Sequence, residues 1–441
     1  MTDVVVVGGG VGGLVAARDL AKGGAHVVLV EASDVLGGMV RSHVVAGLQL
    51  DMAAESFATR GDTVASLAVE LGLGNDIVPP DPRGAWLMSR TGRAAPLPAA
   101  GLLGIPSVPM AADVIALVGT GGAMRAQLDA LLPGPVGSRA VTLGELVRTR
   151  MGRAVLDDLV VPVAGGVHST HPDDLELDRV APGLRAALLR EGSLAHAVRT
   201  LRATAPAGSA VAGIRGGIFR LVDELAADLD TYRVDVRLGT RAVRIERDGV
   251  EVTTVDGQGE RLDADVVVAG VADPTRPEAP RGAGIELVTL VVDQPALDAA
   301  PRGTGMLVHP DALGVGAKAL THATAKWPWL AERAAGRHVL RLSYALGSRD
   351  GAAGPGAGVS VPLDPAGAFA VRAAADASAL LGVPLDPAGQ VVGAARVRWD
   401  APDTGAALAD GVVGVGEASS GRGLAGIVGA ARVAARRVIE D

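Results

Sequence analysis

The sequence predicts a two-domain α/β protein. A four-valine strand, Val4 to Val7, enters the glycine-rich run GGGVGG, and a helical pattern and a second strand, His26 to Val30, follow it. Strand and glycine patterns return at Gly213, after a long stretch of amphipathic helices. The chain of 441 residues exceeds one ordinary domain. We therefore expect an α/β domain whose pieces are interleaved with a second, α+β domain.

The glycine run has the spacing of a dinucleotide site, with Gly8, Gly10 and Gly13 in a GxGxxG pattern. The first glycine permits a tight turn, the second lets a pyrophosphate approach the backbone, and the third lets the helix pack closely on the strand. The second strand runs into Glu31 and Ala32, where a carboxylate accepts hydrogen bonds from ribose hydroxyl groups. Because an acid there repels a 2′-phosphate, we expect a Rossmann-like site that disfavours NADP.

A second glycine pair, Gly37-Gly38, is followed by Arg41, whose guanidinium suits a pyrophosphate. This doublet with its arginine resembles the FAD-binding start of the amine oxidase and protoporphyrinogen oxidase superfamily. The resemblance implies a Rossmann-like FAD-binding domain of the glutathione-reductase-2 type.

The segment LQLDMAAES, from Leu48 to Ser56, is similar to the D-x-G-A-E segment of that superfamily, which runs beside the flavin. Ala53 stands where the family has a glycine, and the resemblance places Ala54 and Glu55 at the cofactor. The absence of cysteine excludes a flavin bound through a cysteine sulfur, a disulfide framework and a thiolate metal site. We expect the FAD to be non-covalent.

Composition and charge limit the classes of partner that this chain can bind. The net charge of −8 and the pI near 5.6 argue against a nucleic-acid-binding surface. The first strand begins by residue 4, which leaves no room for a secretory or transit peptide, so we expect a cytoplasmic location. The apolar stretch from Gly101 to Gly119 contains Pro106, Pro109 and Asp113 and is a poor membrane span. It is either a peripheral apolar surface that touches a membrane or a helix and loop that cover the active site.

The pattern along the chain predicts the domain boundaries. We assign residues 1–75, 211–275 and 395–441 to the FAD-binding domain, and residues 76–210 and 276–394 to the substrate domain, which includes a helical subdomain. Further expected elements are a helix in residues 62–74, a hairpin in 86–98, a helix at 142–151 with Thr142 as N-cap and Glu145 in a capping box, and strands joined by turns at Asp248-Gly249 and Asp256-Gly257.

Internal segments narrow the resemblance to the coproporphyrinogen oxidases of Gram-positive bacteria. Residues 160–199 resemble their PLLGGVYAGDP segment, and Lys326, Trp327 and Pro328 match their Lys-Trp-Pro element. The tail VGEASSGRGLAGIVGAARVAARRV aligns with theirs without gaps. The resemblance implies further cofactor contacts at Val243, whose backbone meets the adenine, and at Gly416, Glu417, Gly423, Leu424 and Ala425.

One departure concerns the substrate wall. After Trp399-Asp400 the family has a segment resembling PQYxVGH and a long helix, whereas this chain runs almost directly into its last strand. The tyrosine and histidine of that segment have no counterparts here.

Several side chains are candidates for the substrate. Lys326 either approaches the flavin, meets a substrate propionate, or covers the ring of Trp327 as structure. Arg83, Arg90 and Arg93 either meet propionates or form a solvated basic face. His168 and His171 have a spacing that more often marks surface polarity than a metal site, and no metal is expected. No catalytic residue is assigned.

The resemblance implies that a porphyrinogen loses six electrons by hydride transfers to FAD, with O2 as acceptor, in haem synthesis. Two alternatives stay open. The first is a flavin oxidase or desaturase acting on another apolar or amine substrate. The second is a non-catalytic flavin or porphyrin carrier.

Overall fold

The valines of the first strand are all buried, because both faces of their sheet are covered. In the computed structural model, Val4 and Val6 face a layer of helices, while Val5 and Val7 face a small antiparallel sheet. Side-chain alternation along the strand thus explains the continuous apolar run. The structure describes residues 2–59, 61–168, 170–203, 211–271, 274–275, 284–346, 358–399, 408–420 and 423–440.

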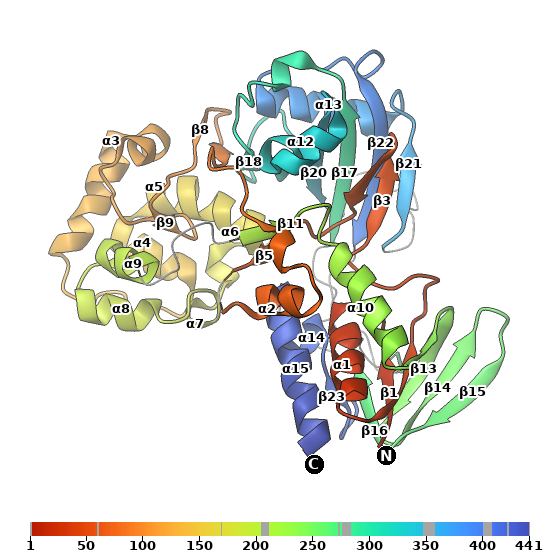
Figure 1. Cartoon of the computed structure of the whole chain (residues 1–441). Coiled ribbons are helices and arrows are strands. Elements are labelled where there is room, and N and C mark those ends of the chain that lie inside the picture. Colours follow the sequence, from red (N-terminus) through yellow and green to blue (C-terminus); the bar gives the residue numbers. More distant parts are fainter. Residues whose placement is uncertain are drawn as a thin grey trace.

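This first sheet has five parallel strands in the order β12-β2-β1-β16-β23. They are β12 (Asp235–Arg237), β2 (His26–Val30), β1 (Asp3–Val7), β16 (Val266–Ala269) and β23 (Val413–Gly414). The helices on one face are α1 (Val11–Lys22), α10 (Arg220–Thr231) and α15 (Leu424–Glu440). The other face carries β13 (Thr240–Glu246), β14 (Gly249–Thr254) and β15 (Gly259–Asp263). In Figure 1 these elements form the lower lobe, where both termini lie.

An eight-stranded sheet forms the upper lobe of Figure 1. Its order is β21 (Ser360–Leu363), β22 (Val391–Trp399), β17 (Ile285–Val292), β20 (His338–Ala345), β19 (Ala319–His322), β18 (Gly305–Val308), β7 (Trp86–Met88) and β8 (Ala94–Pro96). Helix α13 (Ala368–Leu381) packs on one face. The other face carries the hairpin of β3 (Ser42–Val45) and β4 (Leu48–Asp51), with α11 (Ala323–Lys326) and α12 (Pro328–Ala334).

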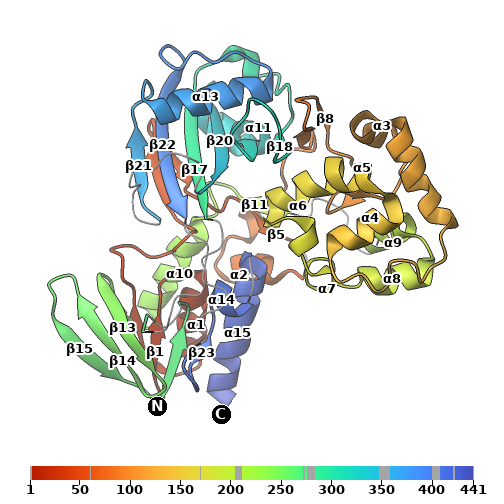
Figure 2. The ribbon, with the colours of Figure 1, turned by 180° about the vertical axis from the view of Figure 1, so that it is seen from behind.

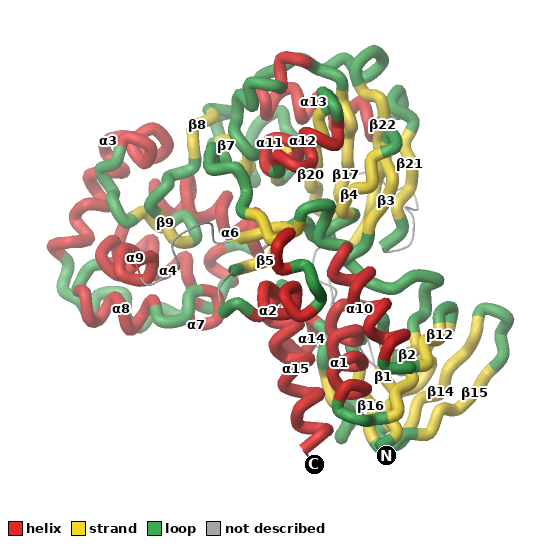
Figure 3. The backbone as a smooth tube through the Cα atoms, in the orientation of Figure 1, coloured by secondary structure: helices red, strands yellow, loops and turns green. Residues whose placement is uncertain are grey.

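A third lobe is helical, as Figure 3 shows by the absence of long strands from it. Its helices are α3 (Ala112–Gln127), α4 (Leu143–Met151), α5 (Arg153–Val155), α6 (Val161–His168), α7 (Leu177–Val180), α8 (Leu184–Glu191) and α9 (Leu194–Ala203). The capping box is confirmed: Thr142 Oγ1 accepts from Glu145 N at 3.2 Å, and Glu145 Oε2 accepts from Val141 N at 2.9 Å.

The three lobes meet at a small sheet of β5 (Phe57–Ala58), β11 (Val211–Ile214) and β6 (Ile77–Val78), above α2 (Thr63–Glu70). Figure 2 shows this junction from behind. The short strands β9 (Gly101–Leu102) and β10 (Ile105–Pro106) pair before α3, which is kinked at Gly119. Among the described residues, none of the helices combines the length and the apolar character that a membrane span requires.

The expected secondary structure is mostly confirmed, including the β7–β8 hairpin and the two turns of β13–β15. Two placements differ from the division that we expected. The boundary at residue 395 falls inside β22, and the β3–β4 hairpin packs on the eight-stranded sheet. Residues 400–407 lie outside the described part of the chain, and β23 begins at Val413. Strand β22 ends at Trp399, so only residues 400–412 separate it from β23 in the sequence.

Candidate functional site

The glycine motif lies where β1 meets α1. A Cβ on Gly13 would lie 1.9 Å from the carbonyl oxygen of Gly8, so only glycine allows α1 to approach the strand this closely. Gly8 has a φ of +100°, which favours glycine. A Cβ on Gly10, in contrast, would meet nothing within 4 Å. The chain therefore offers open space beside Gly10, at the N-terminus of α1, where helix N–H groups favour an anion.

The second glycine pair lies directly against the first motif. Gly37 N donates to Gly9 O at 2.7 Å, and Gly37 and Gly38 have φ values of +108° and +57°. Arg41 Nε donates to Gly38 O at 3.0 Å, and its Nη2 donates to Gly358 O. The two loops and the guanidinium therefore form one wall beside Gly10.

A pocket of about 200 Å³ opens next to this wall and is lined by Gly8, Glu31, Ala32, the start of β13 and Val271, among others. Glu31 Oε2 accepts from Gly9 N at 2.7 Å, and Oε1 accepts from Ser33 N at 2.8 Å. Val243 does not line the pocket. It is half-exposed at a β-bulge between Ala242 and Arg244, and Ala242 lines the pocket.

The C-terminal pieces reach the same end of the sheet. A Cβ on Gly416 would lie 2.1 Å from Gly270 O, so the chain after β23 packs directly on the chain after β16. Glu417 begins α14 (Glu417–Ser420), and Leu424 and Ala425 begin α15 against the helical layer. Gly423 has a φ of +99°, and its Cβ position is open. Ligands of parallel α/β sheets bind at the carboxyl ends of the strands, which is where these residues gather.

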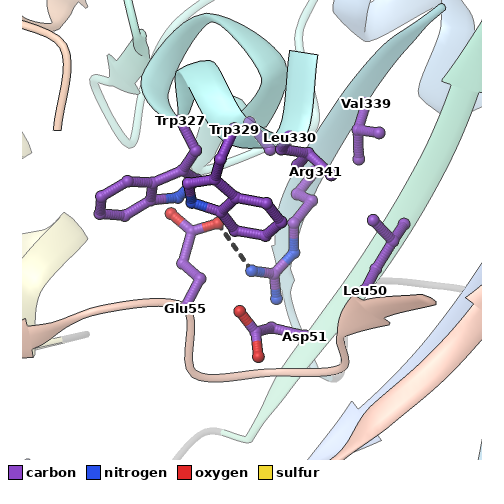
Figure 4. Close-up of a pocket in the computed structure, with 9 residues that line it drawn as sticks. Leu50, Asp51, Glu55, Trp327, Trp329, Leu330, Val339 and Arg341 are labelled. Atoms are coloured by element: carbon purple, nitrogen blue, oxygen red, sulfur yellow. Dashed lines mark hydrogen bonds and ion pairs between the residues drawn. The ribbon is translucent and has the colours of Figure 1, made fainter. Parts of the chain in front are cut away.

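A buried cluster of charges, the Glu55 cluster, consists of Glu55, Lys326 and Arg341. Glu55 Oε1 accepts from Lys326 Nζ at 2.6 Å, and Oε2 accepts from Arg341 Nη1 at 2.8 Å. Arg341 Nη2 also donates to Ala53 O at 2.7 Å. Burial opposes ionisation, but the two cations lower the pKa of Glu55 to about 2. Figure 4 shows Glu55 and Arg341 facing each other beneath the indole rings of Trp327 and Trp329.

Asp51 lies beside this cluster, at the end of β4 (Figure 4). Its two carboxylate oxygens accept from Ile218 N at 3.1 Å and Phe219 N at 3.0 Å, immediately before α10. Burial outweighs these hydrogen bonds and raises the pKa of Asp51 to about 7.

A cavity of about 740 Å³ adjoins the Glu55 cluster through Lys326. It lies between the 79–85 loop, β11 and the β18–β19 pair, and most of its lining is apolar. The lining residues are Pro79, Pro80, Asp81, Pro82, Gly84, Ala85, Val211, Thr304, Gly305, Met306, Leu307, Ala319, Leu320, Thr321 and Lys326.

The other substrate candidates lie elsewhere. Trp327 is buried in the core beneath Gly213, where an added Cβ would lie 2.7 Å from the indole, and Lys326 Nζ is 5.0 Å from its ring. Arg93 is exposed in the turn of the β7–β8 hairpin, and Arg90 is exposed in the same turn. Arg83 pairs with Asp81 at 2.8 Å near the cavity. Arg93 therefore stays a prediction, without a place in the cavity lining.

Of the two candidate histidines, only His171 has a side chain that the structure describes. His171 Nδ1 accepts from Asp173 N at 3.2 Å at the start of a short 3₁₀ turn, and the side chain of His168 lies outside the described part. The described residues contain no group of three His, Asp or Glu side chains arranged for a metal ion.

Sequence reasoning missed Arg341 and Asp51. A signal for Arg341 exists, because it is a lone charge within the apolar strand HVLRLSYA, where burial requires a partner. Asp51 was within the segment that we singled out, but its hydrogen bonds to α10 come from residues 167 and 168 positions away.

Comparison with known proteins identifies the family. The sequence pattern of the flavin-containing amine oxidoreductases matches residues 11–282. The chain belongs to this family.

Relatives of this chain within the family are named coproporphyrinogen III oxidases. The chain is 29% identical over 350 residues to the coproporphyrinogen III oxidase of Propionibacterium freudenreichii, covering 69% of this chain and 66% of that protein. It is 31% identical over 359 residues to the coproporphyrinogen III oxidase of Mycobacterium tuberculosis H37Rv, covering 77% and 75%. An Exiguobacterium protein whose crystal structure is assigned as a protoporphyrinogen oxidase shares the fold, with a TM-score of 0.78 at 22% identity, covering 100% of this chain and 99% of that one.

This amine oxidoreductase family implies a flavin, and the residues present fit one. The open Cβ positions of Gly10 and Gly423, the glycine-only contact at Gly13 and the pocket beside Glu31 are the features that a dinucleotide form of flavin requires.

Proposed function

We propose that this chain is an FAD-dependent oxidase that converts a porphyrinogen, with coproporphyrinogen III favoured, to the porphyrin in haem biosynthesis. The observation that carries the proposal is the cavity of about 740 Å³, mostly apolar, that joins the Glu55 cluster at Lys326. Its size suits a large ligand with an apolar body. The names of the relatives, coproporphyrinogen III oxidase, point to the same class of substrate.

Conversion of a porphyrinogen to the porphyrin removes three hydrides and three protons from the macrocycle. FAD, when bound, would supply the hydride acceptor, and three O2 would be reduced to three H2O2. Around the macrocycle, Pro79, Met306 and Leu307 supply apolar contact and exclude water. Lys326 supplies a positive charge at the wall, which binds a carboxylate of the substrate.

For the cofactor, we assign the ribose to Glu31, the pyrophosphate to Gly10 and Arg41, and the flavin end to Gly416 and the start of α15. We assign the adenine to the backbone at Val243, which follows the pocket-lining residue Ala242 at the β-bulge. We propose that FAD is held without a covalent bond; because the chain has no cysteine, a thioether to the flavin is excluded. Acid precipitation should therefore release all of the flavin.

A cytoplasmic location and a peripheral membrane contact through residues 101–119 remain proposals. Flotation of the purified protein with anionic vesicles tests the contact.

The test of function is aerobic incubation of the FAD-loaded protein with coproporphyrinogen III and, separately, protoporphyrinogen IX. Porphyrin fluorescence and H2O2 are followed against a heat-treated control. A faster rise with one porphyrinogen identifies that compound as the substrate. It also shows that the family segment missing after Asp400 is dispensable for activity. If neither substrate is oxidised although flavin is bound, the porphyrinogen proposal is wrong, and amines or a carrier role come next.

A further inference from the structure

Lysine is rare in this chain, and one of the few lysines is held in a buried cluster. Of 41 basic side chains only three are lysines, at positions 22, 318 and 326. Lys326 is 17% exposed, and its Nζ lies 2.6 Å from Glu55, which is 14% exposed. An ammonium is a compact charge with three donors, so one donor can bind Glu55 while others face the cavity.

Arg341 connects this pair to the frame of the protein. It belongs to β20, in the middle region of the eight-stranded sheet, and is 8% exposed. It binds Glu55 through Nη1 and the carbonyl of Ala53 through Nη2, so it fixes both the side chain and the backbone of the segment that carries Glu55. Arg341 of the sheet thus contacts Glu55, and Glu55 in turn contacts Lys326.

We infer that Glu55 and Arg341 are positioning residues that hold the ammonium of Lys326 at the cavity wall. The cluster of one carboxylate and two cations has a net positive charge, so Glu55 does not cancel the attraction for an anion in the cavity. Only the identity of that anion, a substrate carboxylate, rests on the proposed function.

The chain provides a matched control on the other face of the same sheet. Glu286 binds Arg396 through two contacts, at 2.7 and 2.8 Å, and Arg396 packs over the ring of Phe369 in α13 at 4.1 Å. This pair is as buried as the Glu55–Arg341 pair but faces away from the cavity. Glu286→Gln thus measures the general effect of losing a buried carboxylate.

The first experiment measures lysine reactivity and needs no substrate. The FAD-loaded protein is treated with an amine-acylating reagent, and the labelling rate of each lysine is measured by mass spectrometry. We expect Lys326 to react roughly tenfold faster in Glu55→Gln, which removes a charged hydrogen bond. Lys22 and Lys318 should be unchanged, and Glu286→Gln should leave all three rates unchanged. Equal labelling of Lys326 in wild type and Glu55→Gln overturns the inference.

Should Glu55→Gln not fold, Glu55→Asp keeps the charge but withdraws the carboxylate by one methylene. It should give an intermediate labelling rate, whereas a wild-type rate overturns the inference.

The second experiment is a double-mutant cycle on ligand binding. The affinity of coproporphyrin III and of its tetramethyl ester is measured by fluorescence for Glu55→Gln, Lys326→Met and the double variant. Glu55→Gln should weaken the binding of coproporphyrin III roughly tenfold and leave the affinity for the tetramethyl ester unchanged. Adding Glu55→Gln to Lys326→Met should cause no further loss of affinity. Additive losses overturn the positioning role. If wild type binds neither porphyrin but Lys326 is protected as described, the proposed function fails and the positioning role stands.

Discussion

At the scale of single residues, glycines of one motif have opposite physical requirements. Gly13 is enclosed, because a side chain there would collide with Gly8 O at 1.9 Å. Gly10 is open, with φ of −73° and ψ of 173°, a conformation that alanine adopts readily. Gly13 thus serves packing of the fold, while Gly10 leaves room for a ligand.

We therefore expect Gly10→Ala and Gly13→Ala to separate binding from folding. Gly10→Ala should keep the thermal stability of the apoprotein and weaken FAD binding roughly tenfold to a hundredfold, because its methyl group occupies the space beside the backbone N–H groups. Gly13→Ala should destabilise the apoprotein by roughly 1–3 kcal/mol. Calorimetry of the apoproteins and flavin-fluorescence titration measure the two effects. Unchanged FAD affinity in Gly10→Ala would contradict this assignment.

At the scale of elements, Asp51 joins the end of β4 to the start of α10. Its carboxylate accepts two backbone N–H groups at the positive end of the helix, which favours the charged form. Burial is nevertheless the larger effect and raises the pKa of Asp51 to about 7. The contact therefore holds β4 and α10 together, but it buries a carboxylate whose charged form is poorly solvated.

This raised pKa predicts a specific pH dependence of stability. The folded state binds the Asp51 proton up to about pH 7, whereas the unfolded state releases it near 3.8, so stability should fall as pH rises between these values and then level off. Asp51→Asn should remove that fall. The melting temperatures of wild type and variant are measured from pH 5 to 8. The difference between the two should change as the pH rises to about 7 and stay constant above it. Parallel curves would show that Asp51 does not titrate in this range. Glu55 does not contribute to this change, because its pKa is lowered to about 2. Its stabilising contribution is complete above pH 4.5 and is lost only as the pH falls from 4.5 to about 2.

At the scale of the whole molecule, the proposed cofactor site is assembled from distant parts of the chain. The glycine loops before residue 42, the start of β13 and the residues around α14 all reach one end of the five-stranded sheet (Figure 1). The upper sheet joins them through Arg41, which bonds to Gly358 O, and through the Glu55 cluster. A ligand bound at this site should therefore stabilise the upper sheet as well as the lower lobe.

FAD should raise the melting temperature of the whole chain in a single transition. At a free FAD concentration one hundred times Kd, the expected stabilisation is about 2.7 kcal/mol. Gly10→Ala should show a much smaller shift at the same concentration, because its affinity is reduced. Differential scanning calorimetry of the apo and loaded forms measures both. A loaded form in which the upper sheet melts at its apo temperature would show that the lobes are energetically independent.

Short-range sequence patterns were sufficient to predict the local elements: the β1–α1–β2 unit with its glycines, the β7–β8 hairpin, the capping box at Thr142 and the turns of β13–β15. These depend on side-chain periodicity and backbone sterics within a few residues, so a short window contains the information. The tertiary structure decided that Arg341 joins Glu55 and Lys326, that Trp327 lies in the core rather than the cavity, and that Arg93 is exposed. Glu55 is separated from Lys326 by 271 positions and from Arg341 by 286. Such contacts depend on how the sheets pack and on which buried charges must find partners, and no local pattern contains that information.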